Sequence, residues 1–319
     1  KTTATVVARN SEDQNQVHTF KDNTSATHHE ITLTGLMPDT VYAYTVETGR
    51  GNHVYTESYS FKTAPVPGRR KSFVFAYASD SRNAQGGGER NIEGTNAYIM
   101  KKIVALARFK EAAFMQFTGD MIDGYLNSVD ATEVQYRNWK RAIEPFAHYI
   151  PVVAGMGNHE VVTHTFKNTS RSNIKRLLRL LTRAPGTFAI DRFPYETESA
   201  EAVFANQFVN PTNGPDSEDG AAYDPNPNQQ DFPSYKENVF YYIYDNVAMI
   251  VLNSDYWYAP GIKSYPETGG NLHGYLMDKQ LEWLEATVAV LEADNNIDFI
   301  FVTHHTPAFP NGGHLGDDM

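Results

Sequence analysis

The chain contains no cysteine, which excludes disulfide bonds and thiolate metal ligands. Positive charge is scarce as well, since 27 Lys and Arg residues stand against 38 Asp and Glu residues and the formal net charge is -11. Because proteins that bind nucleic acid generally present a basic surface, nucleic acid is not expected as a general partner. No apolar run approaches the length needed to span a bilayer, so no membrane segment is expected.

What the chain does contain is enough length for two domains. Its 319 residues, 41% of them hydrophobic, suit a globular protein with a sizeable core. Short β-prone runs that alternate apolar and polar residues predict half-buried antiparallel strands near the N-terminus. These runs lie at 3–8, 30–33, 41–46 and 55–61. A Pro/Gly-rich segment at 63–70 follows them and marks the predicted domain boundary.

The segment 36–42, Leu-Met-Pro-Asp-Thr-Val-Tyr, resembles a turn of the fibronectin type III sandwich. In that turn a tyrosine at the start of a strand bonds back to the preceding loop, and Tyr42 takes this place. About four or five strands are visible where a complete sandwich has about seven. We therefore expect residues 1–66 to form a partial, all-β fibronectin type III-like domain whose first strands are missing, with Lys1 inside a strand.

Residues 71–319 follow a different pattern, in which strands and helices alternate. Apolar runs at 72–78, 112–117 and 149–154 are separated by two helical patterns, the second of which contains Trp139. Strand, helix, strand in this order predicts an α/β fold with parallel pairing.

Regular secondary structure is predicted again near the C-terminal end of the chain. The dipeptide Asp245-Asn246 between two apolar runs predicts a hairpin over 238–252. A helix over 276–291 and a last strand over 299–302 follow. Between these parts, residues 161–237 are predicted to be a long surface excursion with one basic helix at 174–181.

Four polar clusters come directly after four of the predicted strands. Their positions are 79–82, 119–123, 157–160 and 303–307. Because the carboxyl ends of parallel strands share one edge of a sheet, the clusters can converge. Together they offer Asp, Asp, Asn and His, which are oxygen and imidazole ligands suited to Zn, Fe or Mn. One carboxylate could hold two ions about 3.5–4 Å apart, and one of the ions would then lower the pKa of a water for attack on phosphorus.

The order Asp-x-x, Gly-Asp-x-x-Asp, Gly-Asn-His-Glu and Val-x-x-His resembles the calcineurin-like metallophosphoesterase family. The preceding fibronectin-like segment makes the chain similar to the purple acid phosphatase branch of that family. The resemblance implies that residues 71–319 form a four-layer α/β/β/α sandwich whose C-terminal part is missing. It also implies hydrolysis of phosphate esters by a dinuclear centre of divalent or trivalent ions and a metal-bound hydroxide.

Carried over by position, the resemblance assigns a role to each donor. Asp80 would bind the first metal, Asp120 would bridge both metals, and Asn158 and His305 would bind the second. His159 would serve as an acid for the leaving-group oxygen or would stabilise charge in the transition state.

Three departures from the family pattern stand out. Arg82 replaces the His or Gly found two residues after the first Asp, and arginine can fork onto phosphate but cannot bind a metal. Asp123 stands where the purple branch has a metal-binding Tyr, so an iron–tyrosinate centre is not expected unless Tyr125 substitutes. The family's closing Gly-His-x-His does not occur before Met319.

Ordinary structural roles remain open for these residues. Asp80 could cap a helix, Asp120 and Asn158 could serve turn chemistry, and Arg82 could pair with a neighbouring acid. His159 taken by itself would be an ordinary loop histidine. Beyond the main set, Asp123 could be a metal ligand or could support the ligands, and His304 is expected to have a structural or supporting role. Four further residues lie on loops that could border the site or be plain surface, namely His164, Tyr256, Tyr258 and His314.

Two functions from different classes remain. We expect a metallophosphoesterase that acts on a phosphate ester at a secreted, periplasmic or cell-surface location. The alternative is a non-catalytic extracellular or surface structural protein that carries a degenerate phosphoesterase fold. The Arg82 substitution and the missing Gly-His-x-His motivate the alternative, and metal content discriminates between the two.

Overall fold

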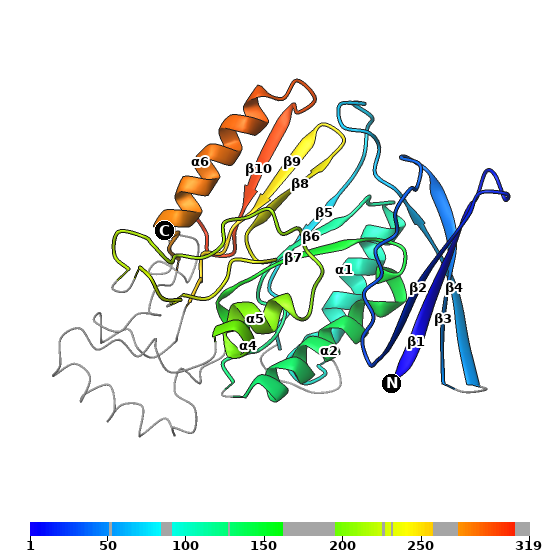
Figure 1. Cartoon of the computed structure of the whole chain (residues 1–319), viewed down its shortest axis with the longest axis horizontal. Coiled ribbons are helices and arrows are strands. Elements are labelled where there is room, and N and C mark those ends of the chain that lie inside the picture. Colours follow the sequence, from blue (N-terminus) through cyan, green and yellow to red (C-terminus); the bar gives the residue numbers. More distant parts are fainter. Residues whose placement is uncertain are drawn as a thin grey trace.

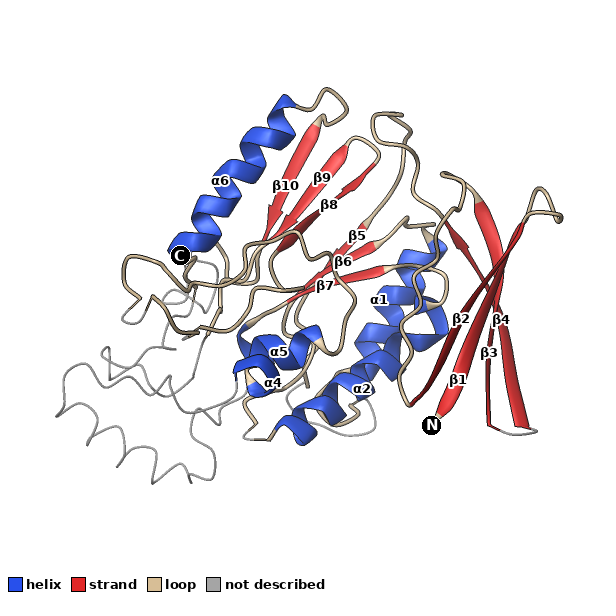
Figure 2. Ribbon diagram, viewed as in Figure 1, coloured by secondary structure: helices blue, strands red, loops and turns tan. Residues whose placement is uncertain are grey.

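The computed structural model describes eight segments of the chain, and its strands form three sheets (Figures 1 and 2). The described residues are 1–50, 53–83, 91–126, 128–161, 195–224, 227–230, 232–257 and 274–309. The predicted basic helix at 174–181 lies outside them, as do His164, Tyr258 and His314.

The N-terminal part forms one four-stranded antiparallel sheet in the order β2-β1-β3-β4. Its strands are β1 (Thr2–Asn10), β2 (Val17–Ala26), β3 (Val41–Arg50) and β4 (His53–Lys62). The prediction of a strand at 30–33 was wrong, because this segment is irregular and does not pair with a neighbouring strand. Its Ile31 and Leu33 side chains line a hollow beside the sheet instead. Strand β2 was not predicted; it is an edge strand in which exposed and half-buried residues alternate and no residue is fully buried.

The predicted tyrosine turn is present. The backbone N–H of Met37 donates to the hydroxyl of Tyr42 at 2.9 Å, and Tyr42 is fully buried. This bond fixes the loop that enters β3. The described strands of residues 1–66 form one sheet, so the fibronectin type III assignment stays a prediction.

The next part is the predicted parallel α/β unit. Its elements are β5 (Ala76–Ala78), α1 (Ala97–Phe109), β6 (Met115–Thr118), α2 (Val129–Ala147) and β7 (Val152–Gly155). The sheet order is β5-β6-β7 and both pairings are parallel, which confirms the prediction from strand and helix alternation. Helix α1 begins where the side chain of Asn96 accepts the N–H of Ile99.

The third sheet has the order β10-β9-β8. Its elements are β8 (Phe240–Tyr244), β9 (Val247–Val251), α6 (Asp278–Ala293) and β10 (Phe299–Thr303). The hairpin predicted around Asp245-Asn246 is confirmed, because β8 and β9 pair antiparallel across that turn. Strand β10 pairs parallel with β9, so its carboxyl end lies beside that of β9.

Three buried clusters show that these elements stack as four layers. Helices α1 and α2 pack on the β5–β7 sheet around Val104, Phe117 and Trp139. Between the two sheets lie Phe114 and Met249, each nearly inaccessible to solvent. Helix α6 covers the far face of the β8–β10 sheet through a third cluster (Figure 2). The predicted α/β/β/α architecture is therefore confirmed.

The predicted surface excursion is partly wrong, because it contributes fully buried residues. Two short helices belong to it, α4 (Tyr195–Glu198) and α5 (Ala200–Ala205). Glu218 is 0% exposed, and its carboxylate accepts the N–H groups of Lys279 and Gln280 in the first turn of α6, together with the hydroxyl of Tyr235. A negative group at a helix N-terminus is favourable, so this tract caps α6.

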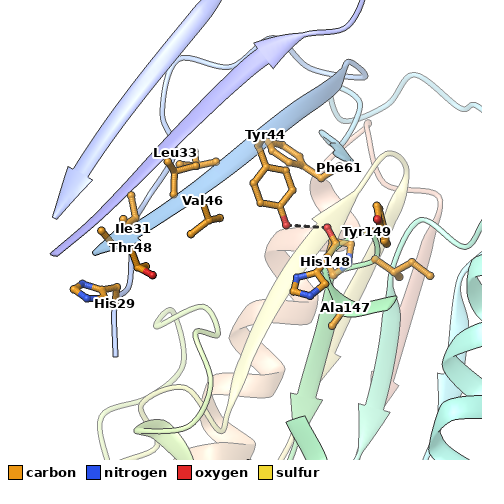
Figure 3. Close-up of a pocket in the computed structure, with 14 residues that line it drawn as sticks. His29, Ile31, Leu33, Tyr44, Val46, Thr48, Phe61, Ala147, His148 and Tyr149 are labelled. Carbon is orange, nitrogen blue, oxygen red and sulfur yellow. Dashed lines mark hydrogen bonds between the residues drawn. The ribbon is translucent and has the colours of Figure 1, made fainter. Parts of the chain in front are cut away.

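The N-terminal sheet contacts the α/β part beside the segment that leads into β7 (Figure 3). The hydroxyl of Tyr44 donates to the carbonyl of His148 at 3.0 Å, and the rings of Tyr59 and His148 stack with centroids 3.8 Å apart. A mostly apolar hollow of about 440 Å³ remains in this seam. No helix among the described residues is long and apolar enough to cross a membrane.

Candidate metal centre

The candidate site lies where parallel strands end. Asp80 follows β5, Asp120 follows β6, and His305 follows β10. Strand β7 leads into the short 3-10 helix η1 (Asn158–Glu160), which carries both Asn158 and His159. The two sheets therefore deliver all four predicted polar clusters to one end of the sandwich.

Four predicted metal ligands come together at this end. One donor atom each from Asp80, Asp120 and His305 lies within 4.8 Å of the other two. The Nε2 atom of His305 is 3.3 Å from Oδ1 of Asp120 and 3.1 Å from Oδ1 of Asn158. The sequence prediction that these residues converge is borne out by geometry, although their binding of a metal stays a proposal.

The orientation of His305 shows which of its atoms faces the cluster. Its Nδ1 atom lies 2.8 Å from the carbonyl oxygen of Thr118, and a carbonyl only accepts, so Nδ1 carries the proton. In the neutral ring Nε2 then presents a lone pair to the oxygens of Asp120 and Asn158. In the charged ring a proton on Nε2 bonds to these oxygens, and in the neutral ring a metal ion could take the place of that proton. The donor set therefore fits a metal ion.

The charges in the cluster depend on one another. Asp120 is 2% exposed, and burial raises the pKa of its carboxyl, although His305 and His159 oppose the shift. Burial alone would lower the pKa of His305, but the surrounding carboxylates, chiefly Asp120, raise it overall. A bound cation would offset the cost of keeping Asp120 ionised while buried.

Glu160 holds the loops of the site together, a role the sequence analysis did not assign. Its Oε2 atom accepts the N–H groups of Gly157 at 2.7 Å and Asp120 at 2.8 Å, and its Oε1 atom accepts that of Met121 at 2.8 Å. Burial raises the pKa of this fully buried carboxyl, whereas the backbone donors oppose that shift. The carboxylate thereby fixes the loop after β6 against the turn after β7.

The two aspartates that begin these loops have unusual backbones. Asp80 and Asp120 have φ angles of +61° and +55°, a left-handed conformation that aspartate tolerates better than most residues. The N–H of Asp80 donates to the carbonyl of Gly119, and that of Arg82 donates to the carbonyl of Asp120. Such local strain is typical of functional sites, where the surrounding structure holds it in place.

Arg82 and His159 approach the second oxygen of Asp120. The Nε atom of Arg82 is 3.1 Å from Oδ2 of Asp120, and its side chain remains 39% exposed. The Nε2 atom of His159 is 3.8 Å from the same oxygen. Arg82 therefore pairs with a neighbouring acid, Asp120, which was one of the two roles that the sequence allowed. Its contact with a phosphate stays a prediction.

The remaining candidates among the described residues lie outside the donor group. Asp123 is outside the donor group, and its carbonyl accepts a bond from Nδ1 of His159 at 2.6 Å. His304 is also outside that group, and burial lowers its pKa. Tyr256 is not plain surface, because it is 1% exposed and its ring stacks on Tyr235; that it borders the site stays a prediction.

A fifth polar cluster, after β9, escaped the sequence analysis. Asn253, Ser254 and Asp255 are each at most 1% exposed. The hydroxyl of Ser254 donates to Asp255 and accepts the N–H of Thr306, so the cluster holds the loop that carries His305. The signal was present, since these polar residues directly follow an apolar strand, as the other four clusters do.

Carboxylate, amide and imidazole donors at the carboxyl edge of an α/β/β/α sandwich define a candidate metal-dependent hydrolase. Family models identify the chain further: residues 92–319 match the calcineurin-like phosphoesterases, and residues 2–63 match the N-terminal domain of purple acid phosphatases. The chain belongs to the calcineurin-like phosphoesterase family. No curated protein matches it in sequence.

Solved structures share the fold. The purple acid phosphatase PPD1 from yellow lupin (Lupinus luteus) seeds is 14% identical with a TM-score of 0.58, and the match covers 98% of this chain and 48% of that one. PhoD is 16% identical with a TM-score of 0.55, and the match covers 97% of this chain and 56% of PhoD. The chain thus spans about half the length of these two structures.

Proposed function

We propose that this protein hydrolyses phosphate esters with the help of metal ions held at the carboxyl ends of β5, β6, β7 and β10. The observation that carries the proposal is the convergence of Asp80, Asp120 and His305 within 4.8 Å, with Oδ1 of Asn158 beside them. Membership of the calcineurin-like phosphoesterase family supports phosphate esters as the substrate class.

The finer proposal is a dinuclear centre of Fe, Zn or Mn. Asp80, Asp120, Asn158 and His305 would hold the ions, which when bound polarise the phosphoryl oxygens and make water a stronger nucleophile. The described donors fit one ion directly. Asp120 would help to hold a second ion, and Arg82 already pairs with one of its oxygens at 3.1 Å.

Two further side chains have proposed roles toward the substrate. His159 is held by the carbonyl of Asp123 with Nε2 directed at the Asp120 side of the site, where it is placed to protonate a leaving-group oxygen. Arg82 is partly exposed and always charged, so its fork suits a phosphate oxygen. We also propose a secreted, periplasmic or cell-surface location, as expected from the sequence.

Replacing Asp120 tests the function. In the intact protein, Asp120→Asn should abolish hydrolysis of an aryl phosphate monoester and should reduce bound metal, measured by elemental analysis, from about two ions per chain. Asp130→Asn, an exposed change on α2, is the matched control and should leave both readouts unchanged. Undiminished turnover in Asp120→Asn would refute the proposal. An intact wild-type protein without metal or activity would instead favour the structural alternative.

A further inference from the structure

The loop after β6 lies directly against the turn that carries Asn158 and His159. A Cβ on Gly124 would overlap the carbonyl oxygen of His159, and Gly124 has a φ of +57°. Its N–H donates to the side chain of Gln135 on α2 at 2.9 Å. The loop is thus anchored on a helix on one side and touches the site on the other, so the next residue, Tyr125, has a defined place.

The hydroxyl of Tyr125 contacts one end of the Asn158 amide. The Nδ2 atom of Asn158 donates to this hydroxyl, whereas Oδ1 lies 3.1 Å from Nε2 of His305. An amide has one donating end and one accepting end, and a rotation by half a turn exchanges them. Only the orientation with Oδ1 toward His305 offers a lone pair to a cation.

The ring of Tyr125 packs on His159. The two ring centroids are 4.2 Å apart with an interplanar angle of 52°. The Nδ1 atom of His159 donates to the carbonyl of Asp123, which leaves Nε2 to face Asp120. Residues 123–125 therefore hold His159 by a hydrogen bond and by ring contact at once.

We infer that Tyr125 is a positioning residue, which holds the oxygen of Asn158 and the imidazole of His159 toward the metal site. The inference rests on the proposed function and deepens it. Asp123 stands where the purple acid phosphatases have a metal-binding tyrosine, and the sequence left open whether Tyr125 takes over that role. Tyr125 does not replace that tyrosine as a ligand, because its hydroxyl contacts the nitrogen end of the Asn158 amide while the donor cluster faces the oxygen end.

Metal affinity is the first test. Tyr125→Phe keeps the ring and removes the hydroxyl, and changes to such supporting partners typically weaken metal binding about 10–100-fold. Titration of the metal-free intact protein with Zn²⁺ or Mn²⁺ should show this loss with little change in melting temperature. Tyr242→Phe is the control, because it removes a hydroxyl bonded to Gln116 between the sheets and should leave metal affinity unchanged. Affinity of Tyr125→Phe within about twofold of wild type would overturn the inference.

A double-mutant cycle separates positioning from general support. A carboxylate presents an oxygen in either orientation, so in the Asn158→Asp background the further change Tyr125→Phe should cost little metal affinity. An equal penalty in both backgrounds would mean that the hydroxyl does not act through the amide, and the inference would fail.

Two more readouts complete the test. Tyr125→Leu also removes the ring, and at saturating metal it should lower kcat beyond the effect of Tyr125→Phe while KM changes less, because His159 loses its packing partner. Fe³⁺-loaded protein should show no visible tyrosinate charge-transfer band, and a band that disappears in Tyr125→Phe would prove Tyr125 a ligand and overturn the inference. Wild-type protein that binds metal but hydrolyses no ester would refute the proposed function alone.

Discussion

The carboxylate of Glu160 accepts the backbone N–H of Asp120 at 2.8 Å across 40 residues of sequence. The same oxygen accepts the N–H of Gly157, and the other oxygen accepts that of Met121. A buried side chain with no direct place among the proposed metal ligands thus sets the distance between the loop after β6 and the turn after β7.

Glu160→Gln should therefore be strongly destabilising. It replaces one accepting oxygen by an NH₂ group that meets backbone N–H donors, and leaving buried donors unsatisfied should cost about 2–4 kcal/mol. Urea unfolding and metal titration of the intact protein measure the effect. A glutamine variant as stable as wild type would contradict this account, because it would mean that Glu160 is protonated in the native protein.

Gly157→Ala should disrupt the site through contact alone. The φ of Gly157 is -123°, which any residue can adopt, but a Cβ there would lie 2.7 Å from N of Asp120 and 2.8 Å from Cγ of His305. We expect loss of metal binding and of activity. Gly155→Ala is the matched control, since its Cβ would meet only a side-chain methyl of Val251 closer than 3.4 Å and should cost far less. Similar effects of the two changes would contradict this account.

Glu201→Gln should change how stability depends on pH. Burial raises the pKa of Glu201 to about 7, from an ordinary value of 4.5. Between pH 4.5 and 7 the native state keeps the proton on Glu201, whereas the unfolded state releases it. The contribution of Glu201 to the unfolding free energy is therefore complete below about pH 4.5 and is lost as the pH rises toward 7. The loss amounts to about 3 kcal/mol. Glutamine keeps an oxygen for the N–H of Trp257 and has no charge to bury.

The difference in unfolding free energy between Glu201→Gln and wild type should therefore be small at pH 4.5 and should favour the variant at pH 8. Urea unfolding at several pH values gives this difference directly. A pH-independent difference would show that Glu201 titrates normally in the folded protein.

Tyr42→Phe tests the turn at the entry to β3. The change removes the hydroxyl that accepts the N–H of Met37, and we expect a loss of about 1 kcal/mol. Urea unfolding of the intact protein checks the loss. Tyr55→Phe, at a residue 66% exposed, is the control and should change stability by less than about 0.5 kcal/mol. If both changes cost the same, the hydroxyl of Tyr42 contributes nothing specific.

Sequence patterns predicted best where the physical signal is local. The parallel unit followed from alternating strands and helices, and the β8–β9 turn followed from Asp245-Asn246, because backbone preference and periodicity act within a few residues. The same reasoning failed at 30–33, where an alternating segment had no ladder partner. It failed again at Glu218 and Tyr256, since polar or loop-rich sequence does not reveal that distant residues bury a side chain.

The sequence by itself determined which chemical groups the site contains and at which strand ends they occur. The four polar clusters could be located because each follows an apolar strand and parallel strands end at a common edge, and the resemblance to the calcineurin-like family singled out Asp80, Asp120, Asn158 and His305 within them. Only the tertiary structure decided which atom of each residue faces which neighbour. Glu160, Asp255 and Tyr125 act through hydrogen bonds and burial between segments far apart in the chain, and those depend on long-range packing that no local pattern records.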